Sequence, residues 1–157
     1  DTFIKDDTIH NMNHYVLDYN KELASNYFIQ SKEIIRFYEK YFGDYQWYDD
    51  GYKLIEVPYL GMEHQSAVTY GNGFSIYNGV RSKSWPMYGV VDPLIIHETG
   101  HEWFGNSVTA ADPTHIWIHE GLQVYSEALF FEDKNDSRQK YSAHYSPPGK
   151  QRIRGYA

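Results

Sequence analysis

The feature that most restricts the fold of this chain is a segment in which ionisable side chains stand between apolar ones. Residues 94–104 read LIIHETGHEWF, with two histidines four positions apart and apolar residues at both ends. Positions four apart share one face of a helix, so a helix here brings both imidazoles together. The apolar flanks predict that this helix is buried, where unpaired histidine and glutamate side chains are costly. A metal ion held by those side chains removes that cost.

His97-Glu98-Thr99-Gly100-His101 has the H-E-x-x-H pattern found in zinc hydrolases. With 8 histidines in the chain, a chance match on a solvated helix face is the competing interpretation. That alternative accounts for the motif but not for its apolar flanks. We therefore predict that both histidines bind one zinc ion. The glutamate lies one step round the helix, where it can take a proton from a water molecule on the metal.

A catalytic zinc site needs a third protein ligand and an open fourth position. Glu120 is the candidate, 19 residues after His101 and at the start of a second expected helix. Two antiparallel helices joined by a loop of this length can face each other. Taken alone, Glu120 is better explained as an acidic residue at a helix N-terminus. The chain contains no cysteine, so any metal must use histidine and carboxylate ligands.

Composition narrows the range of partners. The 157 residues, 41% of them hydrophobic, suffice for one domain that spans residues 1–157. The net charge of −7 disfavours nucleic acid and anionic membranes. No run of 18 apolar residues occurs, so we expect no transmembrane segment. The absence of cysteine is compatible with the cytoplasm or the cell envelope and leaves the compartment unknown.

The order of expected elements predicts an α+β fold, with a helix, then a mixed sheet, then two zinc-binding helices. Apolar residues at three-to-four spacing predict the first helix, and short runs bounded by Gly and Pro predict strands. Asp92 as N-cap and Pro93 in the first turn predict the start of a later helix. The expected elements are a strand at 15–17, a helix at 21–42, strands at 54–57 and 67–70, helices at 93–104 and about 119–132, and a helical tail to about residue 145.

Two segments together resemble a known family. Residues 97–106, HETGHEWFGN, followed by residues 117–121, WIHEG, are similar to the alanyl-aminopeptidase type of gluzincin, the family that includes leukotriene A hydrolase. That family has the same separation between its second histidine and its third-ligand glutamate. The resemblance implies a thermolysin-like zinc-peptidase domain and peptide substrates.

The resemblance also implies roles for individual residues. His97, His101 and Glu120 would bind one zinc ion, and Glu98 would be the catalytic base. Members of the family are much longer, with a β-rich domain before this region and a helical domain after it. We therefore expect that this chain is a fragment and that its flanking domains are missing. The tyrosine that stabilises the oxyanion in the family is expected beyond residue 157.

A shorter motif resembles the substrate-binding loop of the same family. Gly61-Met62-Glu63-His64 is similar to its Gly-Ala-Met-Glu-Asn exopeptidase motif, with His64 in place of Asn and Leu60 in place of Gly. The resemblance implies that Glu63 binds the free α-amine of a peptide and that the loop backbone holds the scissile bond. A carboxylate at a fixed position that pairs with the α-ammonium of the substrate places the first peptide bond, one residue further along, at the metal. Without the zinc motif, Glu63 would be an ordinary polar residue at a strand end.

Three further predictions remain open at this level. His10 and His14 are four apart but lack the central acid, so we expect surface histidines. Glu127 is about equally well explained as a solvated helix residue and as a carboxylate that hydrogen-bonds a ligand histidine. For the function, an aminopeptidase is favoured, and a thermolysin-type endopeptidase or a catalytically inert zinc-binding module are the alternatives.

Overall fold

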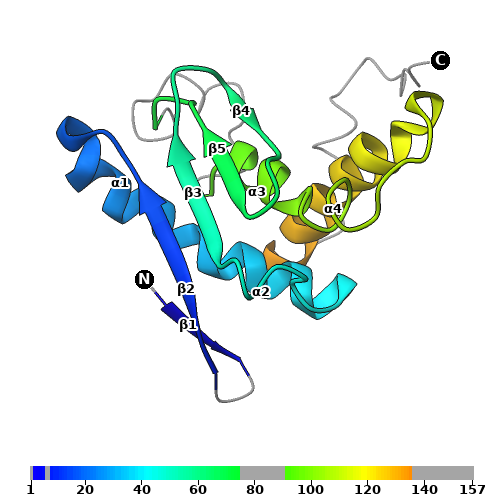
Figure 1. The fold of residues 1–157 in the computed structure, drawn as a ribbon, viewed down its shortest axis with the longest axis horizontal. Helices are drawn as coiled ribbons and strands as arrows, with labels where there is room; N and C mark the ends of the chain where they lie inside the picture. Colours follow the sequence, from blue (N-terminus) through cyan, green and yellow to red (C-terminus); the bar gives the residue numbers. More distant parts are fainter. Residues whose placement is uncertain (1, 6–7, 75–90, 136–157) are drawn as a thin grey trace.

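A five-stranded mixed sheet lies towards the front of the view, with helices behind it and on both sides (Figure 1). The structure is a computed structural model, and it describes residues 2–5, 8–74 and 91–135. The expected helical tail to residue 145 therefore lies outside the described residues. The strands are β1 (Thr2–Lys5), β2 (Thr8–Tyr15), β3 (Tyr52–Glu56), β4 (Gly61–Met62) and β5 (Ala67–Tyr70), in the spatial order β1-β2-β3-β5-β4.

The pairing of the strands explains why helices lie between them in the chain. β2 and β3 are parallel, as are β3 and β5, whereas β1 with β2 and β4 with β5 are antiparallel. A parallel pair needs a long crossover, and the helices between β2 and β3 supply it. The expected order of a helix, then strands, then two helices holds from α1 onward, but the hairpin of β1 and β2 that precedes the first helix was not predicted. The strand expected at residues 15–17 corresponds to β2, which the structure places earlier in the chain, at Thr8–Tyr15.

The crossover is two helices and not the single helix predicted at 21–42. α1 covers Lys21–Tyr27 and α2 covers Ser31–Phe42, with a 3-10 turn at Phe28–Gln30 between them. Gln30 Nε2 donates to the Tyr27 carbonyl at 2.7 Å, and Gln30 Oε1 accepts from Asp92 N–H at 2.6 Å. A side chain has replaced the backbone donor that a continuous helix would supply at Tyr27. The predicted stop is confirmed, because α2 ends at Gly43 with φ 90°.

Helix α3 (Pro93–Gly100) lies at the centre of the fold, where it contacts α2, α4 (Trp117–Asn135), β4 and β5. Its N-cap is Asp92, as predicted, which accepts from Leu94 N–H at 2.8 Å. The Asp92 carboxylate is fully buried and also accepts from the hydroxyls of Tyr27 and Tyr70. These bonds join the start of α3 to α1 and β5.

The end of α3 differs from the prediction of a helix to residue 104. Beyond Gly100 the chain continues in turns, with hydrogen bonds from Glu102 N to Thr99 O at 3.1 Å and from Asn106 N to His101 O at 2.9 Å. The regular bonding between residues four apart therefore gives way to bonds between residues three and five apart, which ends the helix. α4 begins at Trp117, two residues earlier than expected.

The core around α3 is aromatic. Trp103 stacks on Tyr38 with ring centroids 5.0 Å apart, and both rings are buried. The alternation of β2 turns His10, Met12 and His14 to the core side, so both histidines are half-buried and not surface residues as expected. His14 Nε2 lies 3.3 Å from Ser31 Oγ.

Candidate metal centre

The three predicted metal ligands come from two helices that contact each other. His97 and Glu98 lie in the last turn of α3, His101 is the residue directly after it, and Glu120 lies in the first turn of α4. Figure 1 shows α4 beside α3, to the right of the sheet, and the two helices contact each other. The loop between them places the start of α4 against the end of α3.

The ligand atoms of these residues converge on one point. His97 Nε2 and His101 Nε2 are 3.1 Å apart, and Glu120 oxygens lie 3.4 Å from the first and 3.7 Å from the second. Tetrahedral zinc with ligands at about 2.0–2.1 Å requires ligand atoms about 3.3–3.4 Å from one another. Two imidazole nitrogens and a carboxylate at these separations fit a zinc ion.

The other nitrogen of each imidazole is already used. His97 Nδ1 donates to Glu127 Oε1 at 2.7 Å, and His101 Nδ1 donates to the Phe104 carbonyl at 2.8 Å. Such bonds fix the ring orientation and leave Nε2 with its lone pair towards the site. Of the two explanations given for Glu127, the hydrogen-bonded one is confirmed, and this residue is only 7% exposed.

Burial and neighbouring charge act on the titratable groups of the site. Burial raises the pKa of Glu98 to about 7, where His97 opposes the shift and the Glu63 charge adds to it. Burial by itself would lower the pKa of His97, but the hydrogen bond and charge of Glu127 outweigh burial and raise it. Burial lowers the pKa of His101. A carboxyl group with a pKa near neutrality is suited to accept and return a proton.

The fold brings Glu63 to the same place, although it is far from the zinc motif in sequence. Ligand atoms of Glu63, Glu98 and His101 all lie within 4.8 Å of one another. Gly61 lies against the catalytic-base candidate, because a Cβ added to it would lie 2.8 Å from Glu98 Oε1. Met62 is 41% exposed on the short strand β4. The predicted substrate-loop residues and the predicted metal ligands therefore line one site.

Two polar residues that the sequence did not single out hold the loop that carries Glu63. Glu102 Oε1 accepts from Ser66 N–H at 2.7 Å, and Asn106 Nδ2 donates to the Glu63 carbonyl at 3.1 Å. Burial raises the pKa of Glu102 to about 7. The one sequence signal for this pair is spacing, since they follow Glu98 at intervals of four residues.

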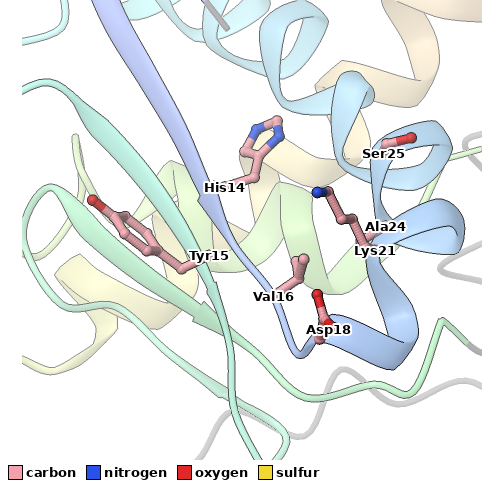
Figure 2. A pocket seen from close by; sticks show the side chains of 7 residues that line it. All are labelled: His14, Tyr15, Val16, Asp18, Lys21, Ala24 and Ser25. Carbon is pink, nitrogen blue, oxygen red and sulfur yellow. The ribbon is translucent and has the colours of Figure 1, made fainter.

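A separate hollow of about 430 Å³ opens between the end of β2 and α1 (Figure 2). It is lined by residues of that corner alone, among them His14, Asp18 and Lys21, and by none from α3, β4 or α4. This hollow is therefore distinct from the metal centre. The tyrosine expected beyond residue 157 lies outside the described residues.

Comparison with known proteins finds similarity over the part of the chain that contains the candidate metal centre. Residues 27–152 match the family model described as the Peptidase family M1 domain. The chain belongs to peptidase family M1. It is 32% identical over 118 residues to human endoplasmic reticulum aminopeptidase 2, a match that covers 70% of this chain and 12% of that protein.

Two other M1 relatives are similar over shorter stretches. Bovine aminopeptidase N is 40% identical over 68 residues, which is 43% of this chain and 7% of the relative. Rat aminopeptidase B is 35% identical over 91 residues, which is 57% of this chain and 12% of the relative. The M1 chain thus spans about an eighth or less of the length of these relatives. Among the described residues, no helix is both long and apolar enough to cross a membrane.

Proposed function

We propose that this M1 peptidase chain forms the catalytic core of a zinc aminopeptidase, which hydrolyses the first peptide bond of peptides with a free N-terminus. The names of its relatives support peptide hydrolysis from that end. The observation that carries the proposal is convergence, because a three-ligand metal site, a buried carboxylate and the Glu63 carboxylate share one place. The proposal includes further domains on either side of this core in the complete protein.

In this proposal, His97, His101 and Glu120 hold one zinc ion. The separations of 3.1–3.7 Å between their ligand atoms support this set of ligands. When bound, zinc lowers the pKa of a water molecule to roughly 7 and polarises the scissile carbonyl. In the neutral imidazoles, the hydrogen bonds at both Nδ1 atoms hold the ring proton there, so each Nε2 is free of a proton and directed at the site.

Glu98 moves the proton. Its carboxylate accepts a proton from the attacking water and later returns it to the nitrogen of the leaving amine. Its burial among Glu63, Glu120 and Glu127 raises the pKa of its carboxyl group, so that the protonated form is accessible between the two steps. A Glu98 oxygen lies within 4.8 Å of both a Glu63 oxygen and a His101 nitrogen, between the substrate-binding and metal-binding groups of the proposal.

Glu63 selects the substrate. Its carboxylate pairs with the α-ammonium of the peptide, which places the first peptide bond nearest the metal ligands. Gly61 and Met62 form β4, which pairs with β5 along one edge. The backbone along the opposite edge of β4 supplies hydrogen bonds to the peptide. An internal segment of a protein has no ammonium to offer, so it binds poorly.

The test compares two substrates in the complete natural protein that contains this sequence. The wild-type protein is expected to cleave an aminoacyl amide and to leave its N-acetylated form intact, and Glu98→Gln is expected to abolish cleavage while zinc content stays the same. Equal cleavage of both substrates would support an endopeptidase instead. Equal activity of Glu98→Gln and the wild type would refute the assigned base. A folded wild-type protein that binds no zinc and cleaves neither substrate refutes the proposal as a whole.

A further inference from the structure

The segment that supplies the metal ligands also grips the loop between β4 and β5. Glu98, Glu102 and Asn106 lie at intervals of four residues; Glu98 lies against Gly61 of β4, and Glu102 and Asn106 hydrogen-bond the loop itself. β4 and β5 both contact α3, and they lie beside it in Figure 1. Glu63 lies in this loop and is half-buried. The loop is therefore attached to the metal-binding segment and not to the sheet alone.

The firmest of these attachments is at Ser66. This residue has φ 55°, the left-handed region that residues other than glycine rarely adopt, and it is 8% exposed. Its N–H donates to Glu102 Oε1 at 2.7 Å, and its carbonyl accepts from Lys53 N at 3.1 Å. A buried N–H without a partner is costly, so the Glu102 oxygen stabilises a conformation that the backbone would otherwise leave.

Glu102 is an unusual choice for a residue that merely fills space. It is 1% exposed, and its second oxygen, Oε2, is buried without a hydrogen-bond partner among the described residues. Burial of a carboxyl group with one oxygen unsatisfied is unfavourable compared with an apolar side chain of similar size. The largest interaction that offsets this burial is the bond to Ser66 N–H in the loop that carries Glu63, and the Tyr45 and Asn106 side chains and the charge of Lys53 also lower the pKa of the Glu102 carboxyl group.

We propose that Glu102 is a positioning residue for substrate selection. Through Ser66 it holds the turn at 63–66 against the metal-binding segment, and so fixes the distance between the Glu63 carboxylate and the metal ligands. The inference rests on the proposed function, in which Glu63 binds the substrate ammonium. A displacement of about 1 Å at a binding carboxylate is enough to weaken a substrate contact that depends on fixed geometry.

The experiment uses Glu102→Leu and Glu102→Gln in the complete protein, with an aminoacyl amide and its N-acetylated form as substrates. Leucine removes the acceptor, so the KM of the free substrate should rise about 10-fold with kcat changed less than about 3-fold, because a contact to the bound ammonium acts mainly on substrate binding. Preference for the free substrate should fall by a similar factor. Glutamine keeps an oxygen for Ser66 N–H, so it should restore KM to within about 3-fold of the wild type.

Tyr52→Phe is the matched control. It removes another buried hydrogen bond to α3, between the Tyr52 hydroxyl and Thr99 Oγ1 at 2.8 Å, and keeps the carboxylate of Glu102 that accepts from Ser66 N–H. It should lower the thermal midpoint of unfolding but leave the preference for the free substrate unchanged. Zinc content, measured for each variant, should remain equal to that of the wild type.

Asn106→Ala provides a second route, because this half-buried residue holds the Glu63 carbonyl and its loss is less of a threat to folding. It should raise the KM in the same direction by about 3-fold. A selective wild type with unchanged selectivity in both Glu102→Leu and Asn106→Ala overturns the inference alone. So does a Glu102→Gln variant as impaired as Glu102→Leu. A wild type that does not prefer the free substrate overturns the aminopeptidase proposal, and the positioning role falls with it.

Discussion

Removal of the Glu127 carboxylate is expected to weaken zinc binding while the chain stays folded. Glu127 Oε1 accepts from His97 Nδ1 at 2.7 Å in a buried position on α4. The bond orients the imidazole and makes its Nε2 a better ligand. Loss of such a partner lowers metal affinity by about 10–100-fold, or about 1.4–2.8 kcal/mol.

Two substitutions separate orientation from charge. Glu127→Gln keeps the volume and an acceptor oxygen, so its loss of affinity should lie near the lower limit. Glu127→Leu removes the acceptor and should lie near the upper limit. The affinity is measured by competition with a fluorescent zinc chelator, and circular dichroism checks that each variant is folded.

Asp133→Asn is the control for a lost acidic group on the same helix. Asp133 contacts Lys40 and Tyr41 on α2, on the far side from the site, so this variant should bind zinc as the wild type does. A folded Glu127→Leu protein with wild-type zinc affinity would refute the reasoning. It would mean that His97 is held by its packing and not by Glu127.

Two further predictions concern stability. Gly100→Ala should lower the free energy of unfolding, measured in urea, by about 1–3 kcal/mol. The new methyl group would overlap the Tyr38 hydroxyl and the Gln123 amide. An unchanged or raised free energy of unfolding would contradict this close packing. Burial, aided by the charge of Lys32, lowers the pKa of His14 to about 4, so the folded state favours neutral imidazole. Stability should be complete above about pH 6.5 and fall by roughly 1–2 kcal/mol as the pH drops towards 4, after a discount for solvent screening at this half-buried site. A His14→Gln variant with the same decline would exclude this origin.

Local spacing predicted the parts of the site that one helix carries. His97 and His101 converge because four-residue spacing on α3 demands it, and Asp92 caps that helix for reasons visible in its own sequence. Glu120 is different, because a carboxylate at a helix N-terminus has an ordinary explanation. Its role came from resemblance to a family, and the structure adds the convergence of its carboxylate with both imidazoles.

The features that the sequence could not predict depend on contacts between distant segments. Gln30 interrupts the first helix by binding Asp92, which lies 62 positions away. Glu102 hydrogen-bonds Ser66, which lies 36 positions away, and neither residue type predicts such a partner. The hairpin of β1 and β2 was missed for a similar reason, since the residues of β2 are largely polar and its core side carries histidines.

The helix that carries His97, one of the proposed metal ligands, is anchored at its start by protein groups. The Asp92 carboxylate ties the start of α3 to Tyr27 and Tyr70, so folding alone fixes the direction of the helix axis. The entropy of ordering His97 and His101 is therefore lost when the chain folds and not when the ion arrives. Small domains that fold only around zinc behave in the opposite way. Under the proposed zinc site, a chelator should therefore remove the ion and leave α3 folded, and added zinc should refill the site without any refolding of the chain.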